Sequence, residues 1–263
     1  MTFPVEFHIL GRSFPAHPVM EVLAYTGGFQ LYLRLRRRER FRESTIPFDQ
    51  TMWLLVGCVF GALVGSKLLA WAESPLDYWH ARADPRVWLG GKTIVGGLLG
   101  GWIGVEMAKS RLRIRHSTGD VFVFPLILGI AVGRIGCFLT GLPDHTYGNF
   151  TNLPWAVNFG DGPRHPTQLY EIAFLICLGV ALAIRARRPM WNGRLFRLFM
   201  LGYLGFRFLI EFIKPTYKPW LGLSAIQLAS LIGVIWCARS LLRAKTRWRH
   251  TIATEVTSNE CAA

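Results

Sequence analysis

Long apolar runs alternate with short polar segments along almost the whole chain. Seven runs approach the roughly 20 residues that a helix needs to cross a bilayer. They lie near residues 17–34, 51–72, 93–109, 120–139, 168–185, 195–213 and 222–242. The third run is crowded with glycine and the first is short. The pattern predicts an all-α, polytopic membrane protein with seven transmembrane helices.

The basic residues indicate how these helices are oriented. They cluster between the runs, with 20 of the 30 Lys and Arg on one side of the predicted bundle and 7 on the other. By the positive-inside rule, the N-terminus lies outside and the C-terminus is cytoplasmic, which agrees with an odd number of spans. We expect one transmembrane domain over residues 1–245 with a long outward loop at 140–167. Residues 246–263 are polar and unpatterned, and we expect a disordered cytoplasmic tail there.

Composition supports this class and argues against others. Half of the residues are hydrophobic (51%), and the formal net charge is +14. Such a charge would suit nucleic-acid binding only on the basic face of a soluble fold, whereas here it lies between apolar runs. No nucleic-acid partner is therefore expected. The five cysteines form no CxxC pair, so we expect neither a disulfide framework nor a metal site, and no cofactor.

Three basic residues lie inside the predicted spans: Lys67, Arg134 and Arg207. Ionisable groups in hydrocarbon are costly and tend to face a polar cavity or one another. Acidic and amide side chains occur at similar depth: Glu21, Glu106, Gln168, Glu171, Glu211 and Gln227. Together these residues predict a chamber filled by water or by lipid headgroups.

Tyr203, Arg207 and Glu211 recur every four residues, which places them on one face of the sixth helix. A simple interpretation is a structural ion pair between Arg207 and Glu211. The alternative is that Glu211 holds Arg207 so that other guanidinium donors can bind an anion.

Arg134 lies between Gly133 and Gly136 in the fourth run, and its simplest interpretation is a side chain that snorkels to the membrane surface. Two arginines that converge from different helices would instead suit a phosphate, which the planar guanidinium binds bidentately. In a membrane the abundant phosphate ester is the phospholipid headgroup.

Two further motifs have simpler interpretations. The segment GGKTIVGGLLGGWIG (90–104) has overlapping small-xxx-small spacings, which favour close helix packing without a ligand. RHPTQLYE (164–171) ends the long loop and begins the fifth helix, where Gln168 and Glu171 place polar groups at the membrane edge.

The chain resembles the prolipoprotein diacylglyceryl transferase family. The resemblance rests on HPVMEVLAYTGGF, GALVGSKL, GGLLGG, GRIGCFLTG, RHPTQLYE, YLGFRFLIEF and SAIQ, which occur in the family's order. It implies seven spans with the N-terminus outside, in the bacterial cytoplasmic (inner) membrane. It also implies transfer of the diacylglyceryl group of phosphatidylglycerol to the lipobox cysteine thiol of a prolipoprotein, with release of glycerol phosphate.

The resemblance also implies partners and site residues. The partners are phosphatidylglycerol, the prolipoprotein signal peptide and membrane lipids. Arg134 corresponds to the arginine of the family's GR signature, and Tyr203, Arg207 and Glu211 to its sixth-helix element. The candidate substrate-binding residues are Arg134, Arg207, Gly133, Gln168, Glu171 and Lys67.

Several positions depart from the family pattern. Val95 stands where the family has the histidine that is proposed to activate the thiol. Cys137 and Thr140 replace asparagines of the signature, and Glu21 stands where a tyrosine is common.

A thiol nucleophile benefits from a base or a nearby cation, and His145, with Asp144 beside it, is the candidate base in the long loop. The predicted catalytic residues are His145, Asp144, Tyr203 and Glu211. Two alternatives stay open: a phospholipid-dependent transferase with a different acceptor, and a membrane protein that binds anionic lipid without chemistry.

Overall fold

The computed structural model describes residues 3–9, 12–38, 46–80, 84 and 90–260. Within these residues the fold is mostly helical. The helices are α1 (Ala16–Arg36), α2 (Phe48–Glu73), α3 (Pro75–His80), α5 (Ile94–Arg111), α6 (Val123–Thr140), α7 (Thr167–Ala186), α8 (Arg194–Ile210) and α9 (Ala225–Glu260). Short 3₁₀ turns are η2 (Asp120–Phe122), η3 (Leu142–Asp144) and η4 (Glu211–Ile213). Each of the seven predicted segments overlaps a helix, and the short α3 was not expected.

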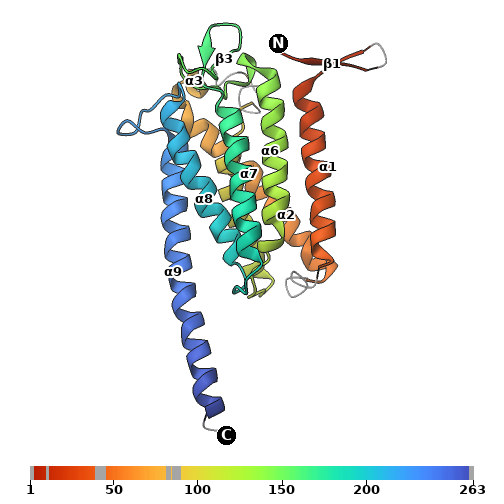
Figure 1. Cartoon of the computed structure of the whole chain (residues 1–263), viewed down its shortest axis with the longest axis vertical. Helices are drawn as coiled ribbons and strands as arrows, with labels where there is room; N and C mark the ends of the chain where they lie inside the picture. Colours follow the sequence, from red (N-terminus) through yellow and green to blue (C-terminus); the bar gives the residue numbers. More distant parts are fainter. Residues whose placement is uncertain (1–2, 10–11, 39–45, 81–83, 85–89, 261–263) are drawn as a thin grey trace.

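Two small antiparallel hairpins were not predicted. β1 (Glu6–Ile9) pairs with β2 (Arg12–Pro15), directly before α1, and β3 (Val157–Asn158) pairs with β4 (Pro163–Arg164) in the long loop. Both lie at the same end of the bundle, where α6 ends and α1 and α7 begin (Figure 1). We call this the loop end.

Four helical segments in the described part of the chain are long and apolar enough to cross a membrane. They are Phe48–Glu73, Asp120–Thr140, Thr167–Ala186 and Ala225–Ala244. The protein is therefore an integral membrane protein by the length and composition of its helices. α9 crosses the predicted domain boundary at residue 245 and continues to Glu260, and the division of the chain into domain and tail stays a prediction.

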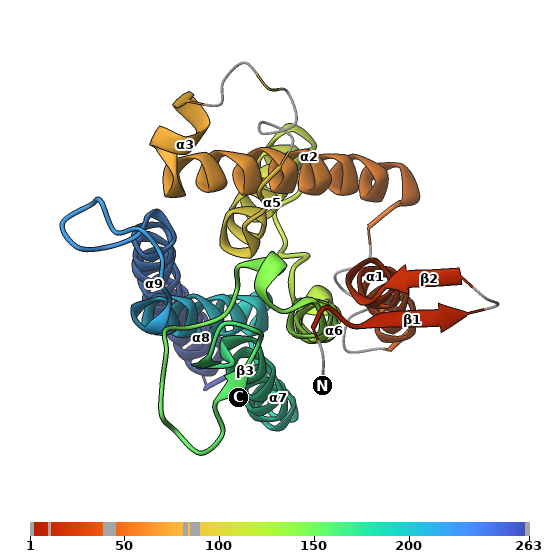
Figure 2. The same ribbon diagram turned by 90° about the horizontal axis from the view of Figure 1, so that it is seen from above.

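Figure 2 shows the helices from above, with neighbouring helices side by side. α1 lies against α6, α6 against α7, α7 against α8 and α8 against α9, while α2 pairs with α5. Buried apolar side chains, among them Val123, Leu175, Phe199 and Leu204, form one core that joins α6, α7 and α8. This core fixes the three helices that carry the site described below.

The pairing of α2 with α5 depends on glycine at both surfaces. A Cβ added at Gly61 would lie 2.3 Å from the carbonyl oxygen of Gly100, and one at Gly104 would lie 2.0 Å from that of Gly57. No side chain fits at such distances, so the two backbones touch directly. The helix-packing interpretation of the 90–104 segment is confirmed.

Polar caps fix where two helices begin. The amide of Ser224 donates to Gln227 Oε1 (2.9 Å) and the amide of Gln227 donates to Ser224 Oγ (3.1 Å), which is a reciprocal capping box at the start of α9. Asp120 accepts hydrogen bonds from the amides of Gly193 and Phe196 at the start of α8. The SAIQ motif thus has a structural role.

Candidate active site

A buried carboxylate joins the two arginines that the sequence singled out. Glu171 Oε2 on α7 lies 2.9 Å from Arg134 Nε on α6 and 3.0 Å from Arg207 Nη1 on α8. All three side chains are buried, with at most 6% of each side chain exposed. Arg134 is therefore paired inside the bundle, and its interpretation as a snorkelling side chain is wrong. We call Arg134, Glu171, Tyr203, Arg207 and Glu211 the arginine network.

The sixth-helix pattern contributes the rest of the network. Tyr203 Oη donates to Glu171 Oε1 (2.6 Å), and Arg207 Nη2 donates to Glu211 Oε2 (3.1 Å). The spacing of four residues does place these groups on one face, and the predicted Arg207–Glu211 ion pair is confirmed. Glu171 was predicted as a substrate-binding residue, and the structure places it at the centre of the network.

The network is close to electrical balance, with two arginines and two glutamates. Lys214 Nζ, also buried, lies 3.9 Å from Glu211 Oε2. Burial, and then the charge of Arg207, lowers the pKa of Lys214 to about 7. The charge of the site therefore changes near neutral pH, and below that pH it carries one extra positive charge.

Donors remain for a further anion. A guanidinium has five N–H donors, and the Nε of Arg207 has no hydrogen-bond partner among the described residues. Gly133, one residue before Arg134, has no atom within 4 Å of the position that a Cβ would take. The backbone face at Gly133 is therefore uncovered in the structure.

The second glycine of the signature has a different role. A Cβ on Gly136 would lie 2.9 Å from the Cβ of Met20 and 3.4 Å from the Cα of His17. Only glycine lets α1 approach α6 this closely. The approach brings His17, at the start of α1, beside Cys137 at the end of α6.

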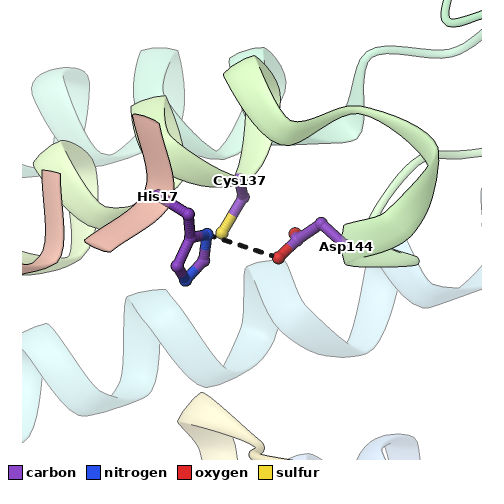
Figure 3. A group of neighbouring side chains, drawn as sticks. All are labelled: His17, Cys137 and Asp144. Carbon is purple, nitrogen blue, oxygen red and sulfur yellow. Dashed lines mark ion pairs between the residues drawn. The ribbon is translucent and has the colours of Figure 1, made fainter. Parts of the chain in front are cut away.

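His17, Cys137 and Asp144 form a second group, which we call the loop-end cluster (Figure 3). One ligand atom from each lies within 4.8 Å of the other two, and His17 Nδ1 is 3.6 Å from Asp144 Oδ1. These imidazole, thiol and carboxylate groups can hold a metal ion. Arg134 Nη1 lies 3.8 Å from Cys137 Sγ, so the cluster adjoins the arginine network.

α7 supports both groups from its first turn. Gln168 Nε2 donates to Thr146 Oγ1 (3.1 Å), and Thr146 Oγ1 donates in turn to Asp144 Oδ2. One helical turn later, Glu171 contacts the arginines. The HPTQLYE motif therefore positions the carboxylate of Asp144 and the guanidinium groups together.

The long loop is held in place by Arg164. Its guanidinium lies over the ring of Phe150 (3.7 Å to the centroid) and donates to Asp161 and to the carbonyl of Gly148. The hydrogen bond from Arg164 holds the pKa of the Asp161 carboxyl below its usual value. The loop is therefore an ordered part of the loop end.

Other predicted residues lie elsewhere. His145 is exposed at the end of η3 with a φ of 53°, and its ring lies 6.4 Å from that of Tyr147. Asp144 contacts His17 instead. Lys67 Nζ donates to the carbonyls of Gly90 (2.7 Å) and Gly91 (3.1 Å), so it holds the segment before α5.

Sequence reasoning missed His17. Its neighbours Cys137 and Asp144 are about 120 residues away along the chain, and no local pattern links them. Cys137 did carry a signal, since it stands at a signature position. Val95, at the position of the family's histidine, is 1% exposed within the apolar core.

Comparisons with known proteins show the family to which the chain belongs. The sequence model of the family described as prolipoprotein diacylglyceryl transferase matches residues 4–243. The chain is 33% identical over 223 residues to the phosphatidylglycerol–prolipoprotein diacylglyceryl transferase of Bordetella parapertussis, covering 79% of this chain and 81% of that protein. It is 33% identical over 267 residues to the protein of the same name from Cupriavidus pinatubonensis, covering 91% and 93%. For that of Photobacterium profundum the identity is 31% over 253 residues, covering 88% and 91%.

Proposed function

Because the chain belongs to the prolipoprotein diacylglyceryl transferase family, we propose that it transfers the diacylglyceryl group of phosphatidylglycerol to the lipobox cysteine thiol of prolipoproteins. Glycerol phosphate is the second product. The observation that carries this proposal is the pair of buried arginines, Arg134 and Arg207, which converge from two helices on Glu171.

The proposal includes a topology. The seven long helices, α1, α2, α5, α6, α7, α8 and α9, span the bacterial inner membrane, with the N-terminus and the loop end outside and the C-terminus cytoplasmic. The distribution of Lys and Arg supports this orientation, and the four helical segments that are long and apolar enough to cross a membrane support the membrane location. Prolipoprotein precursors and phosphatidylglycerol then reach the loop end from the same membrane.

Arg134 and Arg207 bind the phosphodiester of the lipid. Arginine suits this task because its planar donors match phosphate oxygens. The anion adds one negative charge to a nearly balanced network, and protonated Lys214 offsets it. Glu171, Tyr203 and Glu211 position the two guanidinium groups through the contacts described above.

The reaction places new charge where these cations lie. The acceptor sulfur attacks the glyceryl carbon that bears the phosphate, the C–O bond breaks, and the leaving phosphate gains a second negative charge. Fixed cations stabilise that charge more in the transition state than in the bound substrate. The arginine network is therefore suited to assist departure of the leaving group.

A transfer assay with the full chain tests the proposal. Phosphatidylglycerol with a labelled acyl chain is incubated with a lipobox peptide, and the thioether product is measured. Arg134→Met and Arg207→Met should each lower turnover by about 10²-fold or more, as removal of a transition-state donor does. Arg111→Met, at the opposite end of the bundle, is the matched control.

Complementation of a transferase-depleted bacterium provides the second measurement. Rescue by the wild-type chain supports the lipobox cysteine as the acceptor. If a well-expressed and correctly inserted chain neither rescues growth nor forms the thioether in vitro, the proposal is wrong, and an acceptor other than the lipobox thiol or simple lipid binding is favoured.

The candidate base in the loop has its own test. His145 is exposed, and the carboxylate of Asp144 lies against His17 and Thr146, so His145→Ala should change turnover by less than about threefold, the usual scale for a surface substitution without a special role. A loss of 10² or more, typical of a general base, would restore His145 to the mechanism.

A further inference from the structure

The loop-end cluster consists of His17, Cys137 and Asp144. It lies beside the arginine network but is not part of it. We propose that this cluster binds a zinc ion, and that the fourth position of the ion binds the acceptor thiol as a thiolate. The identity of the acceptor rests on the proposed function, whereas the metal site itself does not.

The distances suit one tetrahedral ion. Zinc lies about 2.0–2.2 Å from nitrogen and oxygen ligands and about 2.3 Å from sulfur, so its ligand atoms are roughly 3.3–3.6 Å apart. His17 Nδ1 and Asp144 Oδ1 are 3.6 Å apart, which is too long for a hydrogen bond but close to this spacing. Cys137 Sγ lies within 4.8 Å of the other two ligand atoms, so the thiol would move closer to them when the ion binds.

The buried nitrogen of His17 supports a ligand role independently. Nδ1 is shielded from solvent and has no hydrogen-bond partner among the described residues. An unpartnered buried polar atom is costly in a folded protein, and it faces the thiol and the carboxylate (Figure 3). A cation between the three groups would satisfy it.

Charge and outer contacts fit zinc as well. A thiolate, a carboxylate and a neutral imidazole balance the two positive charges of the ion, and thiolate ligands favour zinc over magnesium or calcium. The hydrogen bond from Thr146 to Asp144 is the kind of outer contact that orients a metal ligand.

The site has an open side and lies next to the phosphate-binding arginines. The side chain of His17 is 38% exposed, whereas that of Asp144 is 14% exposed. Cys137 follows Arg134 by three residues, which is about 4.5 Å along a helix axis. A sulfur held on the ion would lie close to the carbon beside the bound phosphate.

The acceptor thiol gives its proton to a zinc-bound hydroxide, which leaves as water, and the sulfur takes its place as a thiolate. A sulfur lone pair then forms the bond to the glyceryl carbon, and the electrons of the C–O bond leave with the phosphate. The ion would thereby take over the thiol activation that the resemblance implies for a histidine at the position of Val95.

The test is metal content of the full-length protein in detergent or nanodiscs. We expect about one zinc per chain in the wild type and in Cys177→Ser, which removes an exposed thiol on α7. Cys137→Ser and His17→Ala should each weaken zinc binding by more than about 100-fold. Thr146→Val, which removes only an outer contact, should weaken it by about 10- to 100-fold.

Cobalt substitution reports the ligands directly. Titration with Co²⁺ alone should produce a sulfur-to-cobalt charge-transfer band in the wild type and in Cys177→Ser but not in Cys137→Ser. Wild-type protein that binds no zinc, or equal binding by Cys137→Ser, would overturn the proposal. Circular dichroism of each variant checks that the fold is retained.

Transfer activity separates this proposal from the proposed function. Full turnover by chelated, zinc-free enzyme would overturn the zinc site and leave the transferase function intact. Loss of turnover in His17→Ala without any bound zinc would assign His17 and Asp144 as a general base and would also overturn it. Stoichiometric zinc without transfer to a lipobox thiol would support the metal site and contradict the proposed function.

Discussion

Replacing Glu171 with glutamine tests the arginine network most directly. The change keeps the shape of the side chain but removes the charge that lies 2.9 Å from Arg134 and 3.0 Å from Arg207. The Glu171 side chain is 2% exposed, so water cannot replace the lost partner. The glutamine can still accept the hydrogen bond from Tyr203, but two buried guanidinium groups then share the single carboxylate of Glu211.

Removal of one partner from a buried ion pair costs about 3–5 kcal/mol. At about 1.36 kcal/mol per factor of ten, the equilibrium constant for unfolding should rise roughly 10²- to 10⁴-fold. Glu21→Gln is the matched control, because Glu21 is 37% exposed and lies 3.8 Å from an exposed Lys92. That pair should contribute no more than about 1 kcal/mol.

Unfolding in mixed detergent micelles, followed by circular dichroism, measures the difference. The double variant Arg134→Met with Glu171→Gln should be more stable than Glu171→Gln alone, because Arg207 and Glu211 then balance each other. A loss in Glu171→Gln no larger than that in Glu21→Gln would refute the reasoning. It would show that the network is solvated or is differently paired.

The remaining predictions concern pH and packing. Because the pKa of Lys214 is lowered to about 7, affinity for phosphatidylglycerol should fall as pH rises through 7, and Lys214→Arg should abolish this dependence. Between pH 7 and 10.5, the ordinary pKa of lysine, Lys214 is protonated in the unfolded chain but not in the folded protein. The free energy of unfolding of the wild type should therefore rise with pH over this range, relative to Lys214→Met. Gly61→Ala places a Cβ 2.3 Å from a carbonyl oxygen of α5 and should lower the free energy of unfolding by about 1–3 kcal/mol. Gly205→Ala places a Cβ where no atom lies within 4 Å and should raise the free energy of unfolding by about 0.5–1 kcal/mol. Thermal unfolding measures both changes.

Periodic patterns in the sequence predicted the helices well. Each apolar run overlaps a helix of the structure, and four of these helices are long and apolar enough to cross a membrane, because apolar length is the property that a bilayer selects. The spacing of Tyr203, Arg207 and Glu211 likewise predicted a common helix face, since contacts between residues four apart depend only on helix geometry.

Contacts between distant segments were harder to predict. The pairing of His17 with Asp144 depends on the close approach of α1 to α6 at Gly136, which no local pattern specifies. Lys67 lies in an apolar run and was therefore predicted to bind substrate, but its ammonium reaches two carbonyls before α5. The short hairpins at the loop end depend on turns rather than on periodicity, and they were missed.

The central position of Glu171 has a consequence for the catalytic cycle. Its carboxylate is an anion tethered permanently beside both arginines, and a tethered group acts at a high effective concentration. It therefore competes with any phosphate that remains after the transfer. Glycerol phosphate should be displaced readily, so that product inhibition stays weak and the arginines are never left without a counterion while the next lipid enters.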